Sequence, residues 1–348
     1  MELTNKDTKM IQAISALAMV CLHLFCTLEY NGLFTPLVYF KDIPLIFYFA
    51  QLSDFCVAGF AFCSGYAHMV KHEQKGYYKN RLLKLFYLLI NFWIVLIAFS
   101  LISIAIGQSS SIPGSLATFL GNFFLYRLTY NGAWWYLFTY AIIVIISPII
   151  LKIVKKFNPI LVLTIGLVLY CVAYYVRVKI HSNWLAMQFG LFGMTLFEYE
   201  VGAVFYRHSF FTKLGQIKAY IDKKSSLIVP ILSLIIFLSM LLGHTLIIRS
   251  LIIAPATGCI IIIIFKINHK PEFVQKILLF IGKHSTNIWL THMFFYLCVF
   301  KDLVYCAKYP LMIFLLMLVI CLAVSVPINL LHSKIVKIID KKFKHGNT

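Results

Sequence analysis

Two histidines and one aspartate stand within long apolar stretches of the chain, where ionisable side chains are costly and usually mark a function. They are His23, His292 and Asp54. A helical rise places His23 about 20 Å and His292 about 22 Å from one membrane face, and Asp54 about 12 Å from the other. Because the apolar core of a bilayer is about 30 Å thick, all three lie close to one level.

Either imidazole titrates near neutral pH, so it can take a proton from a hydroxyl group and return it. Two roles are open for Asp54: orienting a histidine ring, as a carboxylate does in catalytic triads, or making a structural hydrogen bond between helices. Glu198 and Glu200 lie in another apolar stretch, and we expect them to pair with nearby basic residues such as Arg207. Three ionisable groups at one depth favour a functional site over isolated packing residues.

Ten apolar stretches have to position these groups, and each is near the length of a helix that crosses a bilayer. They are residues 10–27, 46–68, 85–106, 133–151, 159–176, 187–206, 227–243, 247–265, 277–299 and 309–331. The chain is 61% hydrophobic and only 12% charged, about half the charged fraction of a soluble domain. The sequence therefore predicts an all-α, polytopic membrane protein with ten transmembrane helices.

Basic residues alternate between the connections. One set of segments holds 24 of the 31 Lys and Arg residues, namely 6–9, 71–84, 152–156, 207–224, 266–283 and 334–344. The other set holds Lys41, Arg127, Arg177, Lys179, Arg249, Lys301 and Lys308. The positive-inside rule then places both termini in the cytoplasm. The net charge of +19 is explained either by anionic lipid head groups or by an anionic cytoplasmic ligand, and we expect no nucleic-acid partner.

We expect residues 1–348 to form a single membrane domain without a soluble extracytoplasmic domain, because the longest cytoplasmic loop is only 207–226. The outer segment 107–132 opens with turn residues and continues with an apolar run. It is either an interfacial or re-entrant lid, or an ordinary tethered loop. The nine cysteines include no C-x-x-C pair, so they indicate small buried hydrophobic residues, and no metal site is expected.

A second polar group lies at the predicted cytoplasmic start of the third stretch. Arg81 and Lys84 are three residues apart, so both project from one face of a helix at the membrane surface. Such a pair suits phosphate groups. The pair also fits the basic residues that ordinarily flank the cytoplasmic end of a transmembrane helix. The sequence leaves both interpretations open.

Five segments, in this order, resemble the membrane acyltransferase 3 family of bacterial integral-membrane O-acyltransferases. They are Gln12–His23, similar to the family's opening helix with its catalytic histidine; Phe60–Tyr66, similar to F-F-x-x-S-G-Y; Arg81–Lys84, similar to R-x-x-R; Ala133–Leu137, similar to its W-F-L helix; and Gly282–His292, similar to its late G-x-x-S-x-x-x-Y-L-x-H. The resemblance covers nearly the whole chain.

The resemblance implies a multi-pass O-acetyltransferase of the bacterial plasma membrane. Acetyl-CoA would bind from the cytoplasm, and the acceptor would be a hydroxyl of a surface glycan or lipid-linked glycan entering from outside. His23 would act as general base or transiently carry the acetyl group, and His292 would position the thioester or stabilise its oxyanion. Direct transfer and an acetyl-histidine relay both stay open. No metal cofactor is implied.

We expect the donor to bind at Arg81, Lys84, Lys9, Gln12 and Ser64. The alternative function is a transporter or flippase of lipid-linked glycans, which predicts polar residues spread along a path and often an internal repeat. The polar residues found here cluster at one depth instead. A scaffold subunit of a polysaccharide assembly would leave the two deep histidines unexplained.

Two positions depart from the family pattern. Gln12 stands where the family has Arg or Lys, eleven residues before His23. Lys84 replaces the second arginine of R-x-x-R, and Phe86 replaces the proline that typically follows. Lys9 is about one helical turn before Gln12 and lies on nearly the same face. Its flexible side chain either carries an ammonium to the place that the family's Arg or Lys would occupy, or serves only as a positive-inside anchor.

The predicted topology is tested by thiol labelling in intact cells. A cysteine placed in segment 108–114 should react with an impermeant reagent, whereas one placed in segment 213–218 should react only after permeabilisation. The background must be free of other cysteines, because the topology places the native Cys306 outside as well. The reverse labelling pattern would invert the orientation and put the acceptor on the wrong side.

Overall fold

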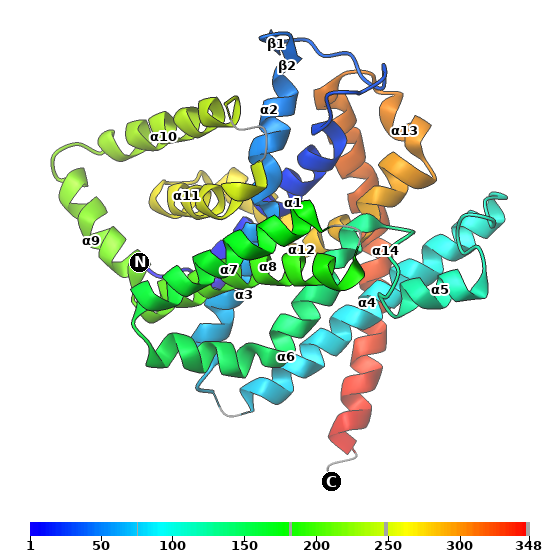
Figure 1. Ribbon diagram of the computed structural model, residues 1–348, viewed down its shortest axis with the longest axis horizontal. Coiled ribbons are helices and arrows are strands. Elements are labelled where there is room, and N and C mark those ends of the chain that lie inside the picture. Colours follow the sequence, from blue (N-terminus) through cyan, green and yellow to red (C-terminus); the bar gives the residue numbers. More distant parts are fainter. Residues whose placement is uncertain (75, 181–182, 247–249, 346–348) are drawn as a thin grey trace. The chain divides into compact units, whose positions relative to one another are not determined.

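The computed structural model describes residues 1–74, 76–180, 183–246 and 250–345 (Figure 1). Lys75, Arg249 and the first residues of the predicted stretch 247–265 lie outside the described residues. Helices make up the regular structure of the described chain, apart from one short antiparallel pair, β1 (Tyr39–Phe40) with β2 (Ile43–Pro44). The prediction of an all-α protein is confirmed.

A helix coincides with each of the ten apolar stretches. These helices are α1 (Asn5–Phe25), α2 (Leu45–Leu52) leading through a 3-10 turn (Ser53–Phe55) into α3 (Cys56–Lys71), α4 (Tyr77–Ala105), α6 (Trp135–Lys156), α7 (Pro159–Lys179), α8 (Trp184–Arg207), α10 (Ile228–His244), α11 (Ala254–Ile267), α12 (Glu272–Met293) and α14 (Pro310–His345). The further helices are α5 (Leu116–Phe123), α9 (Phe210–Asp222) and α13 (Lys301–Tyr305).

Within the described residues, six helical segments are long and apolar enough to cross a membrane. They contain α1, α2 with α3, α4, α6, α7 and α14, while α10 and α11 are apolar but shorter. Helices α8 and α12 carry polar residues such as Glu198 and His284, and neither is among the six. The chain is thus an integral membrane protein, and ten crossings stay a prediction.

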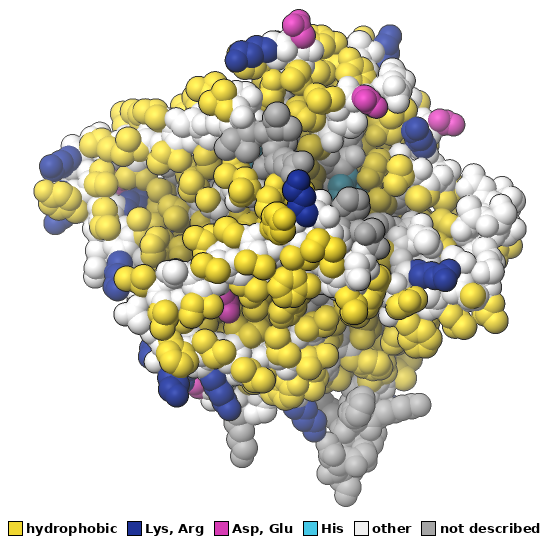
Figure 2. Space-filling model, in the orientation of Figure 1, with side chains coloured by type: hydrophobic (Ala, Val, Ile, Leu, Met, Phe, Trp, Pro, Cys, Tyr) yellow, Lys and Arg dark blue, Asp and Glu magenta, His cyan; other side chains and the backbone are white. Residues whose placement is uncertain are grey.

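Apolar side chains point outward, as expected of helices that face lipid. On α7, Ile160, Ile165 and Val168 are exposed, and on α14 the same holds for Leu311 and Val319. Hydrophobic side chains cover most of the face seen in Figure 2. The surface therefore fits a hydrocarbon environment better than water.

The chain divides into two compact units, each assembled from separate segments. The first contains Met1–Tyr30, Pro36–Tyr78 and Ile145–Lys283; the second contains Asn31–Thr35, Lys79–Val144 and His284–Thr348. The unit boundaries fall within α4, α6 and α12.

In the first unit, α3 and α8 cross with their backbones in close contact. A Cβ atom added at Gly65 would lie 1.9 Å from the carbonyl oxygen of Tyr199, and one added at Gly202 would lie 2.1 Å from that of Phe62. Small residues permit such an approach, which is typical of helix packing in membranes. The glycine of the segment Phe60–Tyr66 is thus explained by packing.

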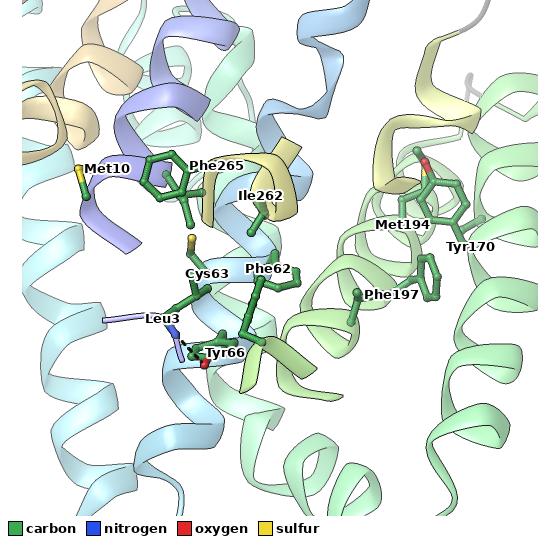
Figure 3. Packing of buried hydrophobic residues seen from close by; sticks show 14 residues of the cluster. Leu3, Met10, Phe62, Cys63, Tyr66, Tyr170, Met194, Phe197, Ile262 and Phe265 are labelled. Atoms are coloured by element: carbon green, nitrogen blue, oxygen red, sulfur yellow. Dashed lines mark hydrogen bonds between the residues drawn. The ribbon is translucent and has the colours of Figure 1, made fainter. Parts of the chain in front are cut away.

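Around this crossing lies the hydrophobic core of the first unit (Figure 3). Phe62 of α3 lies beside Ile262 of α11 in this cluster, and Tyr66 of α3 lies beside Leu3. The backbone N–H of Leu3 donates to the Tyr66 hydroxyl over 3.0 Å. The start of the chain is therefore attached to the same core as α3.

In the second unit, aromatic side chains join α4, α6 and the end of α12. Phe99 stacks on Phe294 with ring centroids 4.1 Å apart, and Phe92 meets Trp134 edge-on at 4.8 Å. The Trp134 indole N–H donates to the carbonyl oxygen of Leu290 over 3.0 Å. Buried indoles need such a partner, so this hydrogen bond fixes the start of α6 against α12.

The outer segment 107–132 forms the short helix α5, which packs on α4 within the second unit. Ser115 caps α5 by accepting a hydrogen bond from the Thr118 N–H. Trp93 stacks on Phe123 at 5.0 Å and donates to its carbonyl oxygen. The buried Asn122 side chain donates to Thr129, which closes the segment. The segment is thus an ordered, packed loop, and its lid role stays open.

The crossing of α3 and α8 predicts a sharp difference between two glycine substitutions. Gly65→Ala should destabilise the protein by about 1–3 kcal/mol, because the added methyl group forces two helix backbones apart. The matched control is Gly243→Ala in α10, where an added Cβ meets no atom within 4 Å. Thermal unfolding in detergent measures both. Equal melting temperatures for the two variants would contradict the packing argument.

Candidate functional site

Helix α1 carries three of the predicted site residues along one face. Lys9, Gln12 and His23 recur at nearly whole numbers of helical turns, with His23 about three turns beyond Gln12. Gln12 and His23 are half-buried, and Lys9 is exposed. Thr4 begins the helix with a capping box, in which its side chain and that of Asp7 each accept a backbone hydrogen bond from the other residue.

Two contacts near its start hold α1 against α11 and α12. The Lys266 ammonium pairs with the Asp7 carboxylate at 2.8 Å, and the Lys9 ammonium donates to the carbonyl oxygen of Gly282 over 3.5 Å. A Cβ atom at Gly282 would lie 2.3 Å from the Lys9 carbonyl oxygen. The glycine of the late motif is therefore a packing position. Since an ammonium has three donors, Lys9 can bind an anion while it keeps this contact.

Ser64 lies on α3, between two residues that contact other helices. Its hydroxyl donates to the Phe60 carbonyl oxygen of its own helix over 3.0 Å. Cys63 reaches the Thr8 carbonyl of α1, and Gly65 meets α8. The Ser64 oxygen keeps its acceptor lone pairs, and its predicted role in donor binding is untested.

Asp54 lies in the 3-10 turn between α2 and α3, a break that interrupts the predicted stretch 46–68. It lines a cavity of about 490 Å³ in the first unit. Its carboxylate interacts electrostatically with the Arg177 guanidinium of α7 and the Glu198 carboxylate of α8. Glu198, which we expected to pair with a basic residue such as Arg207, thus has Arg177 as its cationic neighbour.

His292 ends α12, where the chain changes to one turn of π-helix, Phe294–Cys298. Such turns are rare and frequent at functional sites. The ring is fully buried and stacks on Tyr296, with centroids 6.0 Å apart. Its Nδ1 lies 2.8 Å from the carbonyl oxygen of Trp289. Because a carbonyl only accepts, Nδ1 carries the proton, and Nε2 is the basic nitrogen of the neutral ring.

An aromatic row leads from Arg81 to the residue that orients His292. The Arg81 guanidinium donates to the Tyr140 hydroxyl over 3.0 Å, and Tyr140 stacks on Tyr136 at 5.9 Å. Tyr136 meets Trp289 edge-on at 5.7 Å. The Trp289 indole in turn donates to the Ala133 carbonyl. Sequence reasoning missed Tyr140, although its spacing of four residues from Tyr136 was a usable signal.

Lys84 is exposed, whereas Arg81 is half-buried. The two side chains predicted to form one phosphate-binding pair therefore differ in environment. The Arg81 guanidinium donates to the Tyr140 hydroxyl, whereas Lys84 lies at the protein surface.

A buried polar network joins α4, α12 and α14 in the second unit, and sequence reasoning did not predict it. The Asn91 side chain donates to Asn287 over 2.7 Å, and Asn287 donates to Asn329 over 3.0 Å. His284 and Ser325 share a hydrogen bond of 2.8 Å. Such bonds between helices are favourable in an apolar medium, so the network aligns α12 and, with it, Trp289 and His292.

Each unit holds one of the two deep histidines and some of the predicted donor-binding residues. The first unit contains His23, Asp54, Lys9, Gln12 and Ser64; the second contains His292, Arg81 and Lys84. Among the residues that the structure describes, no group of three or more His, Cys, Asp or Glu side chains is arranged to hold a metal ion.

Comparison with known families gives one match: the model of the Acyltransferase domain, Acyl_transf_3, matches residues 7–330. The matched region includes both histidines, Asp54 and Arg81. Neither the comparison with curated proteins nor that with solved structures gives a match.

The position of Lys9 beside Gln12 generates a prediction about donor binding. Lys9→Ala should raise the KM for acetyl-CoA more than tenfold, because a charged hydrogen bond contributes roughly 1.5–3 kcal/mol. Gln12→Arg in that background should recover much of the loss. Lys6→Ala, another exposed lysine of α1, is the control and should behave like wild type. If Lys9→Ala matches that control at limiting acetyl-CoA, Lys9 is only an anchor.

Proposed function

Because the chain belongs to the acyltransferase 3 family and is an acyl-transferring enzyme of the membrane, we propose that it moves an acetyl group from cytoplasmic acetyl-CoA to a hydroxyl of a cell-surface carbohydrate. The acceptor would be a capsule, O-antigen or exopolysaccharide repeat, free or lipid-linked. The enzyme would cross the bacterial plasma membrane ten times, as a single membrane domain with both termini in the cytoplasm. Membership of an enzyme family disfavours the transporter and scaffold alternatives.

The observation that carries the proposal is the family match, which extends across His23 and His292. Acyl transfer to a hydroxyl needs a base that works at neutral pH and a way to hold a polyanionic donor. The chain offers histidines for the first requirement. It offers Arg81, Lys84 and Lys9 for the second, all on segments that the charge pattern assigns to the cytoplasm.

Arg81 would bind the donor phosphates with an oriented side chain. Its guanidinium is held by the Tyr140 hydroxyl, which lowers the entropy cost of fixing a long side chain. Lys84 and Lys9 are exposed and can adjust to the phosphate positions. Gln12 would donate a neutral hydrogen bond, and Ser64 would accept or donate one.

The reaction itself balances without a metal ion. The acceptor O–H gives its proton to an imidazole nitrogen while its oxygen attacks the thioester carbonyl carbon. The C–S bond then breaks, and the CoA sulfur takes up the proton. We assign the base to His23. In the relay alternative, an imidazole nitrogen attacks the thioester carbonyl carbon, the C–S bond breaks and CoA leaves as the thiol. The acceptor oxygen then attacks the acetyl-imidazole, the C–N bond breaks, and the imidazole takes up the hydroxyl proton.

The tautomer of His292 constrains its role. With Nδ1–H bonded to the Trp289 carbonyl, the neutral ring presents Nε2 as an acceptor. Nε2 can then accept a hydrogen bond from an N–H or O–H group of acetyl-CoA, or accept a proton. It cannot donate a hydrogen bond to an oxyanion. Stabilising the oxyanion would require the protonated imidazolium. Of the two roles open to His292, positioning therefore fits the neutral ring.

The proposed function and the role of His23 are tested together by complementation. Deleting the gene should remove one acetyl group per repeat from the surface glycan, as measured by mass spectrometry. The wild-type gene should restore it, whereas His23→Ala should not, because losing a general base costs about 10²–10⁴ in rate.

His269→Ala serves as the control, since this histidine is exposed and outside the candidate site. It should restore acetylation fully. Membrane abundance must be measured for every variant. Substantial acetylation by a well-expressed His23→Ala protein would refute the catalytic assignment, and an unchanged glycan in the deletion strain would refute the proposed function.

A further inference from the structure

We propose that the cavity beside Asp54 binds the sugar residue that receives the acetyl group, and that this residue is uncharged. The inference rests on the proposed function and extends it to a binding site and a substrate class. The cavity, called the Asp54 cavity below, is lined among others by Cys26, Glu29, Phe47, Gln51, Asp54 and Tyr174.

The size of the Asp54 cavity suits a sugar. Its volume is about 490 Å³, within the roughly 300–1,000 Å³ of small-molecule sites. Its wall comes from the end of α1 and the following loop, from α2 and its 3-10 turn, and from α7. All of these elements belong to the first unit.

The lining offers the groups that recognise a polyol. Glu29, Gln51 and Asp54 present carboxylate and amide oxygens, which accept hydrogen bonds from sugar hydroxyls. Gln51 is only 4% exposed, so its amide is held in place by packing. Phe47 and Tyr174 add aromatic surface that can cover the apolar face of a sugar ring. Mixed polar and aromatic walls of this kind are typical of ligand sites.

The cavity lies at the end of α1 that carries His23. Cys26 lines the cavity and is the residue at which α1 ends, less than one turn after His23. The charge pattern assigns this end of α1 to the outer side of the membrane. A sugar in the cavity would therefore approach from outside, next to the helix turn that holds the proposed base.

Negative charge in the wall sets the class of sugar. Asp54 is itself part of the lining, so its carboxylate contributes to the potential inside the cavity. Glu29 adds a second carboxylate. Arg177, the cationic neighbour of Asp54, is not among the described residues that line the cavity, whereas the two acidic side chains are. These carboxylates would repel the carboxylate of a uronic or sialic acid, since like charges at close range disfavour binding. An uncharged sugar carries no such penalty.

Kinetics with purified enzyme tests the binding role. The acceptor probe is surface polysaccharide from the producing strain, freed of acetyl esters by mild alkali. Tyr174→Ala and Glu29→Gln should each raise the KM for this polysaccharide about tenfold, the equivalent of 1.4 kcal/mol, and leave the KM for acetyl-CoA unchanged. Tyr175→Ala is the matched control, because this neighbouring tyrosine is 61% exposed and does not line the cavity.

Labelling of Cys26 tests the charge and the occupant without any turnover. A cationic methanethiosulfonate should modify Cys26 faster than an anionic one, and Glu29→Gln should narrow the difference. The same polysaccharide should protect Cys26. Peptide mass spectrometry on the native chain reports each cysteine separately, and the exposed Cys306 is the internal control, for which no protection is expected.

The outcomes separate the two proposals. If wild-type enzyme transfers no acetyl group to the polysaccharide, the proposed function fails, whatever Cys26 shows. If wild type transfers acetyl while Tyr174→Ala and Glu29→Gln match Tyr175→Ala, and Cys26 is unprotected, the cavity is not the acceptor site. An acetyl group located by NMR on a uronic acid residue of the product would overturn the charge selectivity.

Discussion

Polar groups inside a membrane protein have to find partners within the protein, because hydrocarbon offers none. This constraint explains the hydrogen bonds made by the part of α12 that belongs to the second unit. Asn287 binds both α4 and α14, and the Leu290 carbonyl accepts hydrogen bonds from Asn131 and Trp134. The Trp289 indole binds the Ala133 carbonyl. A helix held at so many points has a fixed rotation about its axis.

That fixed rotation places the His292 ring beside the Trp289 carbonyl, which selects its tautomer. A carbonyl one turn earlier on α12 accepts from Nδ1, which leaves the basic nitrogen on the other side of the ring. Orientation of a histidine by its second nitrogen is the usual way in which proteins select a tautomer. The aromatic contacts from Trp289 through Tyr136 to Tyr140 then connect this ring to the guanidinium of Arg81. In our proposal, one structural element thus supports both the donor-binding cation and a histidine.

In the first unit, close backbone contacts between helices fix the orientation of the helices. Gly65 and Gly202 bring α3 and α8 together, and Gly282 brings α12 against α1. In lipid, no hydrophobic effect drives helices together, because the lipid tails are as apolar as the side chains. Close backbone contacts stabilise the helix pair through van der Waals packing instead. The α1 face that carries Lys9, Gln12 and His23 is oriented by these contacts and by the Asp7–Lys266 pair. The Asp54 cavity lies at the opposite end of that helix, where a 3-10 turn interrupts the regular packing.

The sequence by itself determined the family and the positions of the helices, because hydropathy and charge are properties of single residues summed along a segment. Helix ends were less well predicted. Helix α4 begins at Tyr77 and α14 extends to His345, beyond the predicted 85 and 331, because backbone hydrogen bonds continue where the apolar side chains stop. The break at Ser53–Phe55 and the π-helical turn after α12 left no mark in the hydropathy pattern.

Only the tertiary structure decided which side chains meet. That Asp54 interacts with Arg177 and Glu198, and that Arg81 binds Tyr140, depends on the rotation of each helix about its axis and on its height against its neighbours. These two variables are set by packing between helices far apart in the chain. A single sequence lists the residues of each helix face, but it does not contain the pairing of those faces. The all-α class was therefore predictable, whereas the cavity, the tautomer of His292 and the asparagine network were not.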